Sequence, residues 1–186
     1  MTSRPLPRVI CGAILALSLF AVVDKTSAQD DYNVRQFYTK TEHYVPMRDG
    51  VKLFTIVYSP RDVSQKYPFW LFRTPYSIAP YGADNYRRVL GPSADFMKEG
   101  YIFVYQDVRG QFKSEGQFVV MRPIVATKRG PQDTDESTDV YDTIEWLLKN
   151  VSNHNGRVGQ SGISYPGSQT VWGMVDAHPA LKASSP

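Results

Sequence analysis

The chain has 186 residues, a formal net charge of +3 at pH 7 and an aromatic content of 13%. The small net charge argues against a nucleic-acid-binding protein, which would carry a strongly basic surface, and the aromatic content argues against a disordered chain. A single cysteine excludes a disulfide within the chain. A domain of about 150 residues buries around two-thirds of the surface of its unfolded chain, so we expect an apolar core to supply the stability.

The first 28 residues have the features of a secretory signal peptide. Arg4 and Arg8 form a basic start, Val9 to Val23 is an apolar segment, and Thr26-Ser27-Ala28 offers the small residues after which a signal peptidase cuts. The apolar segment, about 15 residues long, is shorter than the roughly 20 that a membrane helix needs. We therefore expect an exported protein, secreted or periplasmic, with no stable membrane span after cleavage. An uncleaved N-terminal anchor is the alternative.

The first half of the mature chain is predicted to be mostly β-structure. Residues 36–60 read as a hairpin, because the turn sequence Arg48-Asp49-Gly50 separates two alternating segments. The nearly continuous apolar run Tyr67 to Tyr76 predicts a strand buried on both faces. After a loop, Pro92 to Lys98 reads as a short helix that Gly100 ends, and Tyr101 to Gly110 as a second buried strand.

The second half alternates helices and strands. The sequence predicts a helix over 134–149, capped by Thr134 or Asp133, with Val140, Ile144, Leu147 and Leu148 on its apolar face. A strand over 157–163, a helix from about 166 to 177 and the start of one more strand at the end of the chain follow. Strands alternating with helices after an opening hairpin indicate an α/β sheet, antiparallel at its start and parallel thereafter.

The segment Gly162-Ile163-Ser164-Tyr165-Pro166-Gly167 lies between the last predicted strand and helix, where a nucleophile elbow would be. Gly162 is the small residue that such a turn needs two positions before the serine. Two positions after it stands Pro166, so the common G-x-S-x-G pattern is not matched literally. Proline is tolerated in the first turn of a helix, and it leaves the Tyr165 N–H intact. The alternative is that Ser164 merely caps an ordinary helix.

Five motifs resemble those of one enzyme family in the same order. They are MRDGVKL at 47–53, RTPY at 73–76, DVRG with SEG at 107–116, DESTDVYDTIEWL at 135–147 and NGRVGQSGISYPG at 155–167. The chain resembles, from about Tyr44 to Ala183, the CocE/NonD and X-Pro dipeptidyl-peptidase group of serine hydrolases, which includes cocaine esterase and the α-amino-acid ester hydrolases. In that group the elbow reads G-x-S-Y-x-G, which Pro166 fits.

The resemblance implies an α/β-hydrolase fold, present as its N-terminal part. Residues 29–186 would form a partial α/β-hydrolase domain with a mixed, mostly parallel sheet, and the later strands, cap and C-terminal β-sandwich would be absent. By the same resemblance Ser164 is the nucleophile, and the Tyr76 hydroxyl and the Tyr165 backbone N–H form the oxyanion hole, where a donor lowers the barrier by about 3–4 kcal/mol. The alternative for Tyr76 is a loop aromatic that packs on a neighbouring ring.

None of the nearby acidic residues is assigned to a catalytic triad. Asp107 is expected to form a structural ion pair with Arg109. Asp139 and Asp142 are expected on a solvated helix face, and Asp135 and Glu136 at the positive end of the helix dipole.

The general base is not found among the histidines. In α/β-hydrolases the order along the chain is Ser, then Asp or Glu, then His, and only Asp176 and His178 follow Ser164. About 14 helical residues would separate His178 from Ser164 by roughly 20 Å, and His43 and His154 precede the serine. By resemblance, the acid and the histidine lie beyond residue 186. The chain is then the N-terminal part of a longer enzyme and inactive alone.

The predicted function is therefore hydrolysis of a small-molecule ester, an amide or a short peptide. The alternative is a truncated, inactive remnant that serves as a secreted binding module. A phosphate-binding loop is excluded because no lysine follows the glycines of 159–167. We expect no cofactor and no metal, since no His or Cys pair has the spacing of metal ligands. The oligomeric state is left open.

Overall fold

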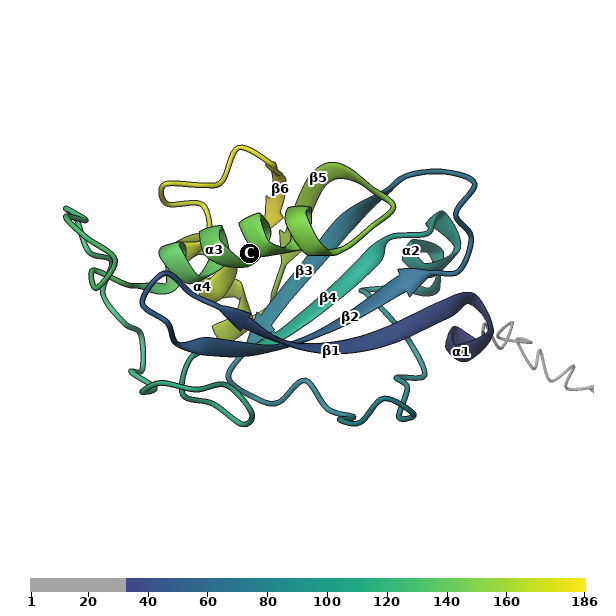
Figure 1. Ribbon diagram of the computed structural model, residues 1–186, viewed down its shortest axis with the longest axis horizontal. Helices are drawn as coiled ribbons and strands as arrows, with labels where there is room; N and C mark the ends of the chain where they lie inside the picture. The colour runs from purple at the N-terminus through teal and green to yellow at the C-terminus, as the bar shows by residue number, and fades with distance from the viewer. Residues whose placement is uncertain (1–32) are drawn as a thin grey trace, which may run out of the picture. The chain divides into compact units, whose positions relative to one another are not determined.

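A computed structural model describes residues 33–186, so the predicted signal peptide and the predicted domain start at residue 29 lie outside the described residues. The described strands form one sheet in the order β1-β2-β4-β3-β5-β6 (Figure 1). They are β1 Tyr38–Pro46, β2 Lys52–Pro60, β3 Tyr67–Thr74, β4 Ile102–Asp107, β5 His154–Ser161 and β6 Leu181–Ser185. Within 33–186, no helix has the length and apolar character that crossing a bilayer requires.

The strand directions confirm the prediction of a sheet that begins antiparallel and continues parallel. β1 pairs with β2, and β2 with β4, in antiparallel fashion, whereas β4, β3, β5 and β6 are parallel neighbours. Gly50 has φ +88° in the turn between β1 and β2, a conformation that glycine adopts without steric cost. The predicted Asp-Gly hairpin is therefore present, and so is the predicted final strand, as β6.

Three helices lie close to their predicted places: α2 Ala94–Glu99, α3 Glu136–Asn150 and α4 Tyr165–Trp172, although α4 ends at Trp172 and not near residue 177. The short helix α1 Val34–Phe37 was not predicted. Gly100, at φ +85°, ends α2 as expected. The cap of α3 is Asp135, however, and not Thr134 or Asp133. Asp135 caps the helix because its carboxylate accepts a hydrogen bond from the Thr138 N–H, and its own N–H donates to the Thr138 hydroxyl. Two backbone donors are satisfied in this way.

The core lies on both faces of the sheet. On one face, Val140, Ile144 and Leu147 of α3 pack on residues of β3, β4 and β5, while the fourth predicted core residue of α3, Leu148, is only partly buried. On the other face, aromatic residues of β2, β3 and β4 pack beneath the loop over 77–91 and α2. The described chain thus encloses the central strands in apolar side chains, as a parallel sheet requires.

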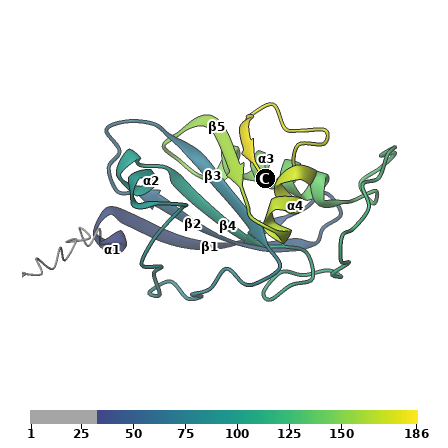
Figure 2. The same ribbon diagram turned by 180° about the vertical axis from the view of Figure 1, so that it is seen from behind.

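The helices α3 and α4 lie on the same side of the sheet and contact each other (Figures 1 and 2). On the opposite side, β3, β5 and β6 line a groove of about 970 Å³ that includes Trp70, Phe72 and Tyr105. Gly162 and Ile163, next to the turn that joins β5 to α4, also line the groove.

Candidate active site

Ser164 lies in a sharp turn between β5 and α4. Its backbone has φ +63° and ψ −126°, a region that residues with side chains rarely adopt and that costs about 1–3 kcal/mol. Its side chain is exposed and makes no capping hydrogen bond to α4. Ser164 therefore occupies the N-cap position of α4 without the side-chain hydrogen bond of an ordinary cap.

Gly162 allows the strand and the helix to approach this closely. A Cβ atom at Gly162 would lie 2.2 Å from both the carbonyl carbon and the carbonyl oxygen of Pro166, and no side chain fits at that distance. A Cβ at Gly167 would lie 3.3 Å from the Gly162 oxygen, which is tight but much less severe. The small residue is thus required before the serine, whereas proline is accommodated after it.

Tyr165 is the first residue of α4, so its N–H has no partner within the helix. The residue is fixed at its other end, because its phenol oxygen accepts a hydrogen bond of 2.9 Å from the Met121 N–H. Its ring also packs against Phe118, with 6.3 Å between the centroids. The long loop before α3 therefore holds the side chain of Tyr165. Within 33–186, no hydrogen bond from its backbone N–H is present.

Tyr76 lies beside Tyr165. Its ring centroid is 6.1 Å from that of Tyr165 in an edge-on arrangement, and 64% of the residue is exposed. Its N–H donates to the Thr74 hydroxyl at 3.0 Å, and the Ile78 N–H donates to the Asp107 carboxylate at 3.0 Å. Because β3 and β5 are parallel, the residues that follow them meet at one edge of the sheet. This edge brings Tyr76 and the Ser164 turn together.

The three histidines of the chain all have partners elsewhere. His178 contacts the Glu145 carboxylate at 2.7 Å, His154 contacts the Leu148 carbonyl oxygen, and His43 contacts the Thr41 hydroxyl. None of the described groups of His, Cys, Asp and Glu could hold a metal ion. The described residues therefore supply Ser164 with no histidine base.

Residues 49–186 match the family model of the X-Pro dipeptidyl-peptidases, the S15 family. The chain belongs to this family. This match confirms the resemblance that the five motifs predict, and with it the α/β-hydrolase fold.

Three relatives of this S15 chain show the range of its family. Cocaine esterase of Rhodococcus sp. is 34% identical over 76% of the chain, which corresponds to 22% of the esterase. A solved α-amino acid ester hydrolase is 38% identical, with a TM-score of 0.69, over 91% of the chain and 28% of the hydrolase. An aminopeptidase from a Thaumarchaeota archaeon is 42% identical, with a TM-score of 0.66, over 78% of the chain and 24% of the peptidase. The S15 chain thus spans about a quarter of each relative, and these relatives are hydrolases.

Asp135 and Glu136 lie at the N-terminal end of α3, as predicted, but other acidic residues of the S15 chain do not lie where the sequence suggests. Asp107 does not pair with Arg109: its buried carboxylate accepts from the Ile78 N–H and, at 2.8 Å, from the Tyr81 hydroxyl. Burial raises the pKa of Asp107, and these hydrogen bonds only partly offset the effect. Asp107 thus holds the loop that follows Tyr76, since its two carboxylate oxygens contact residues of that loop.

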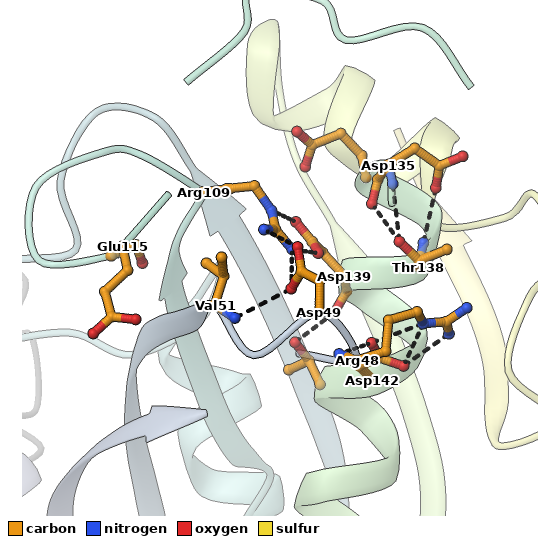
Figure 3. Close-up of polar contacts among 12 residues, drawn as sticks. Arg48, Asp49, Val51, Arg109, Glu115, Asp135, Thr138, Asp139 and Asp142 are labelled. Carbon is orange, nitrogen blue, oxygen red and sulfur yellow. Dashed lines mark hydrogen bonds and ion pairs between the residues drawn. The ribbon is translucent and has the colours of Figure 1, made fainter. Parts of the chain in front are cut away.

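Arg109 lies instead between Asp49 and Asp139, at 2.6 Å from each carboxylate (Figure 3). Asp139 is fully buried, so the prediction of a solvated helix face is wrong for this residue. Asp142, one turn further along α3, pairs with Arg48 of the hairpin turn at 2.8 Å. No sequence pattern reveals that the hairpin turn packs against α3, and without that contact both acids look solvent-exposed.

A second buried polar cluster, around Arg73, was not predicted from the sequence. Arg73, near the end of β3, donates to Gln106 at 2.8 Å and to Gln169 of α4 at 2.9 Å. Its guanidinium lies 3.2 Å from the Glu136 carboxylate without the alignment of a hydrogen bond. Burial raises the pKa of Glu136, and Arg73 offsets this only in part. The one available signal was an arginine within the apolar run of residues 67–76.

Proposed function

We propose that the complete protein carrying this S15 chain is an acyl hydrolase with Ser164 as its nucleophile. The observation that carries the proposal is the backbone of Ser164, which adopts a strained conformation at a strand-to-helix turn and leaves the hydroxyl exposed and unbonded to α4. Strain of this kind is retained where the surrounding structure enforces it, and it is concentrated at functional sites.

In the proposed reaction the Ser164 oxygen attacks the acyl carbonyl carbon while a base removes the hydroxyl proton. The carbonyl oxygen becomes an anion, which accepts hydrogen bonds from the Tyr165 N–H and the Tyr76 hydroxyl. Collapse of this intermediate breaks the bond to the leaving alcohol or amine, which takes the proton. Water then attacks the acyl-enzyme by the same route and regenerates the serine.

The base and its acid are proposed to come from chain outside residues 1–186. The histidines described above have other partners, and α/β-hydrolases place both groups after the nucleophile. The relatives are about four times as long as the segment they share with this chain, which leaves room for such residues. Their names favour an ester, an amide or a short peptide as substrate. We further propose export of the protein, from the signal-peptide features of residues 1–28.

Replacement of the serine tests the proposal. In the complete protein, Ser164→Ala is expected to lower kcat on a p-nitrophenyl ester and on an aminoacyl anilide by at least about 10³-fold. Ser168→Ala, four residues further on in α4, serves as the matched control and should leave kcat nearly unchanged. Equal activity of the two variants would refute the nucleophile. A complete, folded protein without any hydrolysis would favour the binding-module alternative.

Tyr76→Phe tests whether the Tyr76 hydroxyl is the second donor of the oxyanion hole. Loss of the phenol donor is expected to lower kcat about 10²-fold with little change in KM, because the donor acts mainly on the developing oxyanion. Tyr44→Phe is the control, since Tyr44 is a similarly exposed tyrosine on β1. A Tyr76→Phe variant with the kcat of the Tyr44→Phe control would remove Tyr76 from the mechanism.

A further inference from the structure

A single buried guanidinium connects the strand that leads to Tyr76 with the helix that follows Ser164. Arg73 precedes Tyr76 by three residues in the chain, and Gln169 follows Ser164 by five. Their side chains are joined by a hydrogen bond of 2.9 Å from Arg73 Nη1 to Gln169 Oε1, and the two residues are only 3% and 2% exposed. The two donors of the proposed oxyanion hole therefore lie close in sequence to opposite ends of this bond. Tyr76 is near Arg73, and Tyr165 is near Gln169.

The guanidinium is held from several directions at once. Its Nε donates to Gln106 of β4 at 2.8 Å, and its Nη1 also donates to the backbone carbonyl of Glu136 at the start of α3. An arginine side chain presents its donors in a rigid, planar fork, so these contacts fix the orientation of the group. Because the cluster is shielded from water, each of its hydrogen bonds is stronger than at the surface.

We propose that Arg73 is a positioning residue, which sets the separation of Tyr76 and Tyr165 through its bond to Gln169. The inference rests on the proposed function. Tyr76 lies two residues after the end of β3 and Tyr165 begins α4, so their separation depends on the contacts that join these two elements. A misplacement of about 1 Å at a reacting centre lowers the rate by about 10²-fold. A bond that holds β3 against α4 thus acts on catalysis without touching the substrate.

Gln169 is the residue to change, because removal of Arg73 would leave the Glu136 carboxylate buried without its counter-charge. Gln169→Met keeps the approximate shape and removes the acceptor, whereas Gln169→Glu returns an acceptor to Arg73. In the complete protein we expect Gln169→Met to lower kcat by about tenfold or more, with KM changed by less than about twofold. Gln169→Glu should restore kcat to within about threefold of wild type.

Thr170→Val provides the matched control. Thr170 is the next residue of α4 and equally buried, but its hydroxyl donates only to the Pro166 carbonyl of its own helix. We expect this variant to keep kcat within about twofold of wild type. If Thr170→Val lowers kcat as much as Gln169→Met, or if Gln169→Glu fails to rescue, Arg73 has only a structural role.

Two outcomes distinguish a failure of this inference from a failure of the proposed function. If Ser164→Ala retains activity, the proposed function is wrong. If Ser164→Ala is inactive while Gln169→Met has wild-type kcat, only the positioning role is wrong. A crystal structure of Gln169→Met gives a readout that needs no turnover, since the 6.1 Å separation of the Tyr76 and Tyr165 rings should change. An unchanged separation would overturn the inference.

Discussion

Ser164 keeps a backbone conformation that the chain must stabilise through its neighbours. The cost of about 1–3 kcal/mol is offset by the packing of β5 against the first turn of α4, where the Gly162 backbone meets that of Pro166. The glycine spacing in the sequence predicts this turn because the reason is local and steric. The bond between Arg73 and Gln169 has no such signature, since it joins residues that are 96 positions apart.

A methyl group at position 162 tests the steric argument. Gly162→Ala would place its Cβ 2.2 Å from the Pro166 backbone, so we expect a loss of about 1–3 kcal/mol or more in unfolding free energy and a large fall in kcat. Gly130→Ala is the control, because a Cβ at Gly130 meets nothing within 4 Å. Urea denaturation and ester kinetics of the complete protein measure both quantities. Indistinguishable behaviour of the two variants would show that the close approach is not required.

At the scale of elements, Arg109 joins three parts of the fold. It follows β4 and bonds to Asp49 in the hairpin turn and Asp139 in α3 (Figure 3). Burial raises the pKa of Asp49, but the hydrogen bonds and charge of Arg109 outweigh it, so the pKa lies below its usual value of 3.8. A carboxylate with a lowered pKa contributes stability above the unfolded pKa and loses it as the pH falls through the folded value.

Removal of this cation is expected to destabilise the protein strongly. Arg109→Met should lower the unfolding free energy by about 3–5 kcal/mol at pH 7, because it leaves Asp49 without its counter-charge and Asp139 with only the more distant Arg73 guanidinium, at 3.8 Å. The difference from wild type should narrow as the pH falls below 3.8, through the lowered pKa of Asp49. Lys149→Met removes an exposed pair with Glu145 and should change stability little at either pH. A constant difference between pH 7 and pH 3 in urea denaturation would contradict this account of Arg109.

The same element-scale contacts mark the limit of prediction from sequence. The hairpin, the capped helix α3 and the strand before Ser164 follow from turn residues and periodic apolar positions, all within a few residues of each other. The contacts of Asp139, Asp142 and Arg73 depend on which elements become neighbours in space. The periodicity of one helix does not show which elements pack against it. In the sequence, polar residues at a buried contact between elements therefore have the same pattern as a solvated helix face.

At the scale of the whole molecule, the described sheet carries α3 and α4 on one side (Figure 2). A groove along β3, β5 and β6 lies on the other side. The position of Ser164 and Tyr76 at one edge follows from parallel strands, as the alternation of strands and helices predicts. The order in which β4 lies between β2 and β3 is not readable from the sequence. The proposed base and acid also depend on the whole molecule. The S15 chain spans about a quarter of each relative, and both groups are proposed to lie outside it.

The most direct measurement is the mass-spectrometric mapping of a fluorophosphonate adduct on the complete protein. Such a probe reacts with a serine that is activated as a nucleophile and aligned with an oxyanion hole. We predict one adduct, on Ser164, which is absent from Ser164→Ala and retained in Ser168→Ala. An adduct on a different serine, or labelling that persists in Ser164→Ala, would contradict this prediction.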